Sequence, residues 1–224
     1  MKKQKNTPIL YYLFLIDRSG SMSAVREQTV KNINEQIKTL KESAKNERLL
    51  TKLTIMLFDS LAENRFDYLV CNKDINKVPL IEYESYVPDG GTPLRDAIGY
   101  SVTRLQKNLN NILENENVKV LVTIFTDGQE NSSRSWSHEQ IQKMIKQLSE
   151  DGKFIFTFVG AGGIVEVKQY ASSIGISESN TCAYVNSSIG NNEAFKNLRM
   201  ATTNFVSGYA SHKNVSLDFF AKVE

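Results

Sequence analysis

Short apolar segments of strand length alternate with amphipathic segments of helical length along most of this chain. The apolar segments span residues 12–16, 53–58, 118–125, 154–159 and about 183–185. Between the first two, apolar side chains recur at helical spacing, at Val30, Ile33, Ile37, Leu40 and Ala44. Successive parallel strands need a crossover connection, so this alternation is typical of a mostly parallel sheet with helices on both faces.

Two segments refine this fold class. Residues 65–71 follow the second strand after a link too short for a parallel crossover, so we place them as an antiparallel edge strand. Residues 118–125 form the most hydrophobic segment and should be the central strand. We therefore predict an α/β fold with a doubly wound, mostly parallel, Rossmann-like sheet and one antiparallel edge strand.

Helix signals support the same architecture. Ser137 and Gln140 have the spacing of a capping box. A helix that begins near Pro93 is expected to bury one apolar stripe: Leu94, Ile98, Val102, Leu105, Leu109 and Ile112. No linker or repeat divides the chain, so we expect one domain over residues 1–210. Residues 211–224 form a tail or a docked extension that carries Phe219 and Phe220.

Composition excludes several classes of function. The formal net charge of +2 over 224 residues gives no electrostatic preference for nucleic acid or for an anionic membrane. No segment is long enough to span a bilayer. The apolar stretch after the N-terminal lysines is short and lacks a cleavage signal, so we interpret it as a core strand and expect a cytoplasmic protein. Cys71 and Cys182 lack metal-type or redox-type spacing; we interpret them as small buried residues, with a disulfide as the alternative.

Hydroxyl and carboxylate side chains gather where the predicted strands end. The segment 17–21, of sequence D-R-S-G-S, follows the first strand, and T-D-G at 126–128 follows the central strand. A G-G-T-P loop at 90–93 precedes the long helix. Ligands of doubly wound sheets bind beyond the carboxyl ends of the strands, where such loops meet. The oxygen donors in these three loops are Asp17, Ser19, Ser21, Thr92 and Asp127.

A donor set made only of oxygen atoms suits a hard divalent cation. Mg²⁺ commonly binds through a few protein oxygens together with waters, which fits this set, and Mn²⁺ and Ca²⁺ remain alternatives. Ser19 and Ser21 lie two residues apart, so in an extended loop their side chains can point the same way. The glycine-rich loop at 160–163 is expected to line the same face, but it lacks the lysine of a phosphate-binding loop.

The order and spacing of these three motifs resemble the complete metal-ion-dependent adhesion site of von Willebrand factor A domains. The resemblance covers about residues 10–209 and is closest to stand-alone bacterial and phage members, including those associated with tellurite resistance. It implies that Ser19, Ser21 and Thr92 bind the cation directly, and that Asp17 and Asp127 do so directly or through water. It also implies an open coordination position for an Asp or Glu of a partner protein, with AAA+ ATPases and kinase/phosphatase complexes among the partner classes.

Two classes of function follow from this site. The first is a non-enzymatic, metal-dependent protein-binding module. The second is an Mg²⁺-dependent phosphohydrolase of the haloacid-dehalogenase type, in which Asp17 would be the nucleophile; such enzymes need a second aspartate where this chain has Ser19. Asp59 is either a further carboxylate of the site or a turn cap. Trp136 with Arg134 is either a partner contact or part of the packing.

Overall fold

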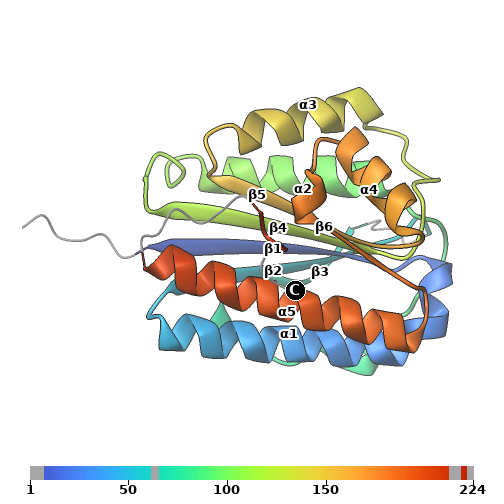
Figure 1. The fold of residues 1–224 in the computed structure, drawn as a ribbon, viewed down its shortest axis with the longest axis horizontal. Coiled ribbons are helices and arrows are strands. Elements are labelled where there is room, and N and C mark those ends of the chain that lie inside the picture. The colour runs from blue at the N-terminus through green and yellow to red at the C-terminus, as the bar shows by residue number, and fades with distance from the viewer. Residues whose placement is uncertain (1–7, 62–65, 212–217, 221–224) are drawn as a thin grey trace, which may run out of the picture.

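The centre of the fold is a six-stranded sheet in the order β3-β2-β1-β4-β5-β6 (Figure 1). The computed structural model describes residues 8–61, 66–211 and 218–220. All neighbouring strands run parallel except β2 and β3, so the predicted antiparallel edge strand and the central position of β4 are confirmed. The strands are β1 (Ile9–Asp17), β2 (Leu50–Phe58), β3 (Phe66–Asp74), β4 (Val118–Thr126), β5 (Phe154–Ala161) and β6 (Thr181–Tyr184).

Helices cover both faces of the sheet, which explains why the inner strands are apolar on both sides. Helices α1 (Arg26–Asn46) and α5 (Ser188–Ala210) cover one face. Helices α2 (Leu94–Leu109), α3 (His138–Ser149) and α4 (Ile164–Ser173) cover the other face (Figure 1). Along β1, Tyr12 and Phe14 pack toward α1 and α5, whereas Leu13 and Leu15 pack toward α2 to α4.

The ends of two helices test the helix predictions. The capping box at α3 is confirmed, because Ser137 Oγ accepts a hydrogen bond from Gln140 N at 3.2 Å and Gln140 Oε1 accepts one from Ser137 N at 2.8 Å. Helix α2 begins directly after Pro93 and ends at Leu109. The prediction that Ile112 belongs to the buried stripe of α2 is therefore wrong: it lies in the turn after the helix and is 36% exposed.

The cysteines lie at the margins of the sheet. Both thiols are free, and Cys71 is exposed while Cys182 is half-buried. The prediction that Cys71 is buried is wrong because β3 is an edge strand whose register with β2 shifts nearby and whose next residue, Asn72, has φ of 45°. Such a break in the ladder turns the side chains away from the regular alternation.

Polar side chains join α1 to α5 along their buried interface. Asn32 Nδ2 donates to Asn191 Oδ1 at 2.9 Å, and Gln36 Nε2 donates to Thr202 Oγ1 at 3.0 Å. All four side chains are buried. Moving α5 along its axis would leave these polar groups without partners, which is costly in a buried interface, so the pairs fix the register of α5.

The described part of the C-terminal segment is docked. Phe219 is 5% exposed, and its ring centroid lies 5.9 Å from that of Phe205 on α5. Its backbone N–H donates to Asn180 Oδ1 at 2.8 Å. The remainder of the 211–224 extension, apart from Ser211 and Asp218 to Phe220, lies outside the described residues.

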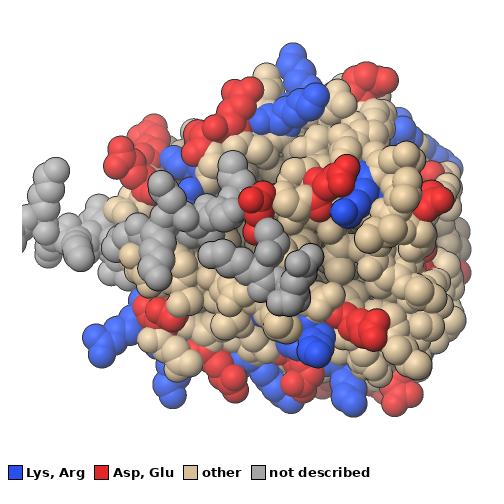
Figure 2. Space-filling model, in the orientation of Figure 1, with Lys and Arg blue, Asp and Glu red and all other residues tan. Residues whose placement is uncertain are grey.

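The surface carries mixed charges. On the face shown in Figure 2, Lys and Arg side chains are interspersed with Asp and Glu side chains, without a broad area of one sign among the described residues. None of the helices in the described ranges is both long enough and apolar enough to cross a membrane.

Candidate metal centre

The candidate site forms where β1 and β4 end side by side. These strands are parallel neighbours, with Ile16 opposite Phe125, so the residues that follow them emerge at the same edge of the sheet. The loop before α2 is tied to the first of these segments by backbone hydrogen bonds, from Gly20 N to Gly90 O and from Asp89 N to Arg18 O, both 2.9 Å long. All three motifs therefore meet at one place.

The side-chain oxygens of the three motifs converge there. Ser21 Oγ donates to Asp127 Oδ1 at 2.7 Å and lies 3.1 Å from Ser19 Oγ. A methyl group placed on Gly128 would lie 3.0 Å from Thr92 Oγ1 and 3.8 Å from both Asp17 Oδ2 and Ser21 Oγ. The structure thus brings together all five side chains that the sequence singled out.

Asp17 occupies the buried end of the site. Its side chain is fully buried and accepts hydrogen bonds from Ser19 N at 2.8 Å and from Thr126 Oγ1 at 2.5 Å. Burial raises the pKa of Asp17 to about 6, and the nearby charge of Asp127 adds to the increase. Ser21 and Asp127 are more exposed, so the opposite end of the site is open to solvent.

A divalent cation fits this donor set. Two carboxylates lie near each other, and within the described residues neither Asp17 nor Asp127 forms an ion pair. Hydroxyls of Ser19, Ser21 and Thr92 complete a set that contains only oxygen. Within the described residues there is no group of three or more His, Cys, Asp or Glu side chains that could hold a metal ion. A cation here would therefore depend on hydroxyl and water ligands as well as carboxylates.

Asp59 caps a turn at the end of β2. It is buried and forms an ion pair with Arg18 at 2.7 Å, and it caps a turn by accepting Leu61 N at 2.9 Å. The turn-cap interpretation is therefore correct, and the Arg18 side chain also pairs with Asp67, at 3.2 Å. On the other side of the segment, Tyr86 Oη donates to the backbone oxygen of Asp17 at 2.5 Å.

The loop after β4 holds Thr92 in place, which the sequence analysis missed. Asn131 Oδ1 accepts from Thr92 N at 2.8 Å, while Asn131 N donates back to Thr92 O at 3.2 Å. Glu130 Oε2 accepts from Arg95 N at 2.8 Å and so satisfies one free donor at the start of α2. An Asn and a Glu soon after the T-D-G motif are the only signals that the sequence offers for these contacts.

A reciprocal contact fixes the rest of this loop. Asp96 on α2 accepts hydrogen bonds from the backbone N–H groups of Arg134, Ser135 and Trp136, at 2.8 to 2.9 Å. The Trp136 ring packs over Gly99, where a methyl group would lie 2.2 Å from the ring. Trp136 is half-buried against the core, so the packing interpretation is correct and the partner-contact interpretation is not supported.

Asn186 links a third loop to the site. Its Nδ2 donates to Asp127 Oδ2 at 2.9 Å from the connection between β6 and α5. The sequence analysis missed this residue, because nothing in the local pattern shows that this connection reaches the end of β4.

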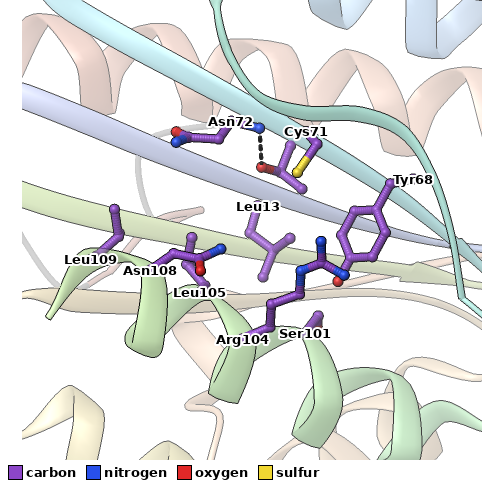
Figure 3. Close-up of a pocket in the computed structure, with 10 residues that line it drawn as sticks. Leu13, Tyr68, Cys71, Asn72, Ser101, Arg104, Leu105, Asn108 and Leu109 are labelled. Atoms are coloured by element: carbon purple, nitrogen blue, oxygen red, sulfur yellow. Dashed lines mark hydrogen bonds between the residues drawn. The ribbon is translucent and has the colours of Figure 1, made fainter.

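Two cavities differ in their relation to the site. A cavity of about 360 Å³ lies beside it, between residues 128–130 and the glycine-rich loop 160–163, so the prediction that this loop lines the same face is correct. The other, between β3 and α2, has about 20 Å³, room for little more than one water (Figure 3). There Arg104 extends from α2 toward Tyr68, its Cζ 4.6 Å from the ring centroid.

Comparisons with known proteins agree with this architecture. The family model described as von Willebrand factor type A domain matches residues 13–199. No curated protein matches the chain significantly. The solved structures described below share less than a quarter of their residues with this chain, so they bear on its fold alone.

Three of these solved structures illustrate the similarity. The pilus adhesin SpaC of Lactobacillus rhamnosus GG, in its open conformation, has a TM-score of 0.64 at 11% identity, over 90% of this chain and 31% of the adhesin. Proximal thread matrix protein 1 of the mussel byssus, with a zinc-occupied MIDAS motif, has a TM-score of 0.54 at 16% identity. The match covers 88% of this chain and 46% of the mussel protein. Manganese-loaded TRAP protein of Plasmodium vivax has a TM-score of 0.54 at 21% identity, and the match covers 85% of this chain and 71% of the TRAP protein. This chain thus spans less than half of the mussel protein and about a third of the adhesin.

Proposed function

The chain belongs to the von Willebrand factor type A domain family, and from this membership and the geometry of the site we propose that it is a non-catalytic, metal-dependent protein-binding module. One observation carries the proposal. Two carboxylates and three hydroxyls converge at the ends of β1 and β4 with no ion pair to either carboxylate among the described residues.

We propose that Asp17, Ser19, Ser21, Thr92 and Asp127 hold the cation, the hydroxyls directly and the aspartates directly or through water. When bound, a divalent cation supplies positive charge that two carboxylates offset only in part, so it can attract a further carboxylate. The exposed position of Ser21 supports access for an Asp or Glu side chain of another protein.

Mg²⁺ is the cation that we propose. A site with few protein ligands and room for water suits Mg²⁺ better than Ca²⁺, which takes six to eight oxygen ligands. The manganese-loaded and zinc-occupied relatives make other divalent cations reasonable comparisons in any binding experiment.

The setting of this module is also a proposal. We propose a cytoplasmic protein of a bacterium or phage that binds proteins, including AAA+ ATPases or kinase/phosphatase complexes, and neither nucleic acid nor membrane. The exposed free thiol of Cys71 supports a reducing compartment. The net charge of +2 and the interspersed surface charges support a protein partner.

The experiment is affinity capture from native lysate with the full chain, in Mg²⁺ and in EDTA. We expect a partner that is retained only in Mg²⁺ and is lost with Asp127→Ala. Glu150→Ala is the matched control, because it removes an exposed carboxylate at the end of α3, away from the three motifs. Retention by Asp127→Ala in EDTA would show that the metal is not the contact. Hydrolysis of a generic phosphomonoester in Mg²⁺, lost with Asp17→Asn, would instead support the phosphohydrolase.

A further inference from the structure

The cavity of about 360 Å³ beside the candidate metal centre is lined by apolar side chains together with two glutamates, Glu130 and Glu166. Phe158, Val167 and Tyr170 line it from β5 and α4, and the ring centroids of Phe158 and Tyr170 lie 5.7 Å apart. Residues 128–130 form one wall and the glycine-rich loop 160–163 forms the other. Its volume is in the range of known ligand pockets.

The cavity is continuous with the metal centre. Thr126 and Gly128 line the cavity, and both also contact the site: Thr126 Oγ1 donates to Asp17 Oδ2, and Gly128 adjoins Thr92 Oγ1. An extended peptide advances about 3.3 Å per residue. If a partner places an acidic residue at the metal, side chains one or two residues away therefore reach the cavity.

The Phe158–Tyr170 ring pair in the lining favours an aromatic occupant. The Tyr170 hydroxyl is buried and has no hydrogen-bond partner among the described residues, and burial raises its pKa, so it remains a neutral donor. Glu130 is less available to a basic side chain, because its oxygens already accept from Arg95 N, Ser132 N and Ser133 N. Glu166 also lines the cavity but is exposed, so an ion pair with it would be screened by solvent and contribute little. Aromatic side chains with a polar end combine a large apolar body with a group that can pair with a buried hydroxyl.

Two exposed apolar side chains follow the glycine-rich loop that lines the cavity. Ile164 and Val165, in the first turn of α4, are 61% and 58% exposed directly after the glycine-rich loop. Exposed apolar side chains beside a pocket are typical of protein interaction surfaces. Among the described residues that line the cavity, none is a lysine or an arginine.

We propose that this cavity is a second subsite of the partner-binding surface and receives a Tyr or Trp side chain of the partner, one or two residues from the acidic residue at the metal. This inference rests on the proposed metal-dependent function. It adds a sequence requirement to that function: the acidic residue of the partner is accompanied by an aromatic neighbour.

The first test examines the cavity without metal. p-Cresol, indole and butylamine are titrated into the full chain while amide NMR shifts are recorded. We expect p-cresol and indole to shift residues 128–130 and 160–167, and butylamine to leave them unchanged. Ile164→Asp should weaken these shifts, whereas Leu50→Asp, a similarly exposed change at the start of β2 and so at the other end of the strands, should not. Shifts from butylamine alone, or no shifts in these segments, overturn the proposal.

The second test joins the cavity to the metal. Each fluorescently labelled peptide contains one Asp and carries Tyr, Lys or Gly at one of the two positions before or after it. Binding of the full chain to each peptide is followed by fluorescence anisotropy in Mg²⁺ and in EDTA. We expect Tyr at one position to tighten Mg²⁺-dependent binding about tenfold over Gly, and Tyr170→Phe to reduce that gain. Equal binding of Gly and Tyr peptides, or a preference for Lys, overturns the subsite and leaves the metal-dependent function standing. Fragment binding in the cavity without any Mg²⁺-dependent peptide binding overturns both.

Discussion

Asn131 and Thr92 hold each other through two hydrogen bonds, although they are 39 residues apart in sequence. The side-chain oxygen of Asn131 accepts from Thr92 N, and Asn131 N donates to Thr92 O. The approach is close enough that a methyl group on Gly91 would lie 2.7 Å from Asn131 Oδ1, which explains the glycine before Thr92. The Thr92 hydroxyl therefore takes its position from a loop that belongs to another strand.

We expect Asn131→Ala to weaken Mn²⁺ binding about 10- to 100-fold, the range observed when a residue that orients a metal ligand is removed. The fold should persist, because Asn131 is exposed and outside the core. Titration of Mn²⁺ followed by electron paramagnetic resonance measures the change. Asn110→Ala, an exposed position at the end of α2, is the control. An unchanged Mn²⁺ affinity for Asn131→Ala means that Thr92 does not depend on this loop, or is not a ligand.

The sequence predicted the oxygen donors because each lies in a short motif directly after a strand or before a helix. Residues of one motif lie at the end of the same strand, and parallel strands end at the same edge of the sheet. The convergence of the motifs therefore follows from the topology. Asn131, Glu130 and Asn186 could not be found in this way. Their contacts depend on how two loops fold back on each other, which no periodicity encodes.

The same distinction holds for the fold. The apolar inner strands were predictable because burial on both faces leaves a continuous run of apolar residues. Ile112 fits the helical spacing of α2 but lies beyond its end, since spacing alone does not show where a helix stops. Cys71 was misplaced because the irregular pairing of the edge strand cannot be read from composition.

The buried carboxylate of Asp17 should make the metal-free protein less stable at neutral pH. Its pKa in the folded state, about 6, lies above the ordinary value of 3.8, so folding favours the protonated form. The unfolded state then releases its proton first as pH rises, and stability falls between about pH 4 and 6. This difference in pKa lowers the free energy of unfolding at pH 7 by about 3 kcal/mol relative to its value at low pH.

Asp17→Asn removes this charge and tests the effect. In EDTA at pH 7 we expect the variant to have a higher free energy of unfolding than the wild type, and at pH 4 the two should be similar. In Mg²⁺ the difference should almost disappear at a hundred times the dissociation constant, because only the wild type gains stability from the cation, by about 2.7 kcal/mol. Urea denaturation at both pH values measures this. A wild type that is the more stable protein in EDTA at pH 7 would contradict the assignment of a destabilising charge to Asp17.

Asp96 should stabilise the loop after β4 more than any exposed carboxylate does. It is buried and accepts three backbone N–H groups, from Arg134, Ser135 and Trp136. Asp96→Ala leaves these donors without that acceptor, and we expect a loss of about 3 kcal/mol in the free energy of unfolding. Asp151→Ala, at an exposed turn, is the comparison. Equal stabilities of the two variants in urea denaturation would show that solvent replaces the carboxylate at no cost.

Helix α5 should not slide when the metal centre is filled, although a terminal helix of this kind could in principle act as a switch. Its pairs with α1, Asn32 with Asn191 and Gln36 with Thr202, are buried and specific to one register. The ring of Phe219 also packs against Phe205 of α5, and this contact is a second one that fixes the position of the helix.

Deleting residues 211–224 removes that second contact, so we expect about 3 kcal/mol less stability, as for the loss of a buried phenylalanine, and an unchanged Mg²⁺ affinity. Hydrogen exchange on residues 190–210 of the full chain, with and without saturating Mg²⁺, tests the register itself. We expect the same protection in both conditions. Protection that changes with Mg²⁺ on α5, and not on α2, would show that the cation selects between two positions of α5, since a ligand shifts such an equilibrium only by its differential affinity for the two states.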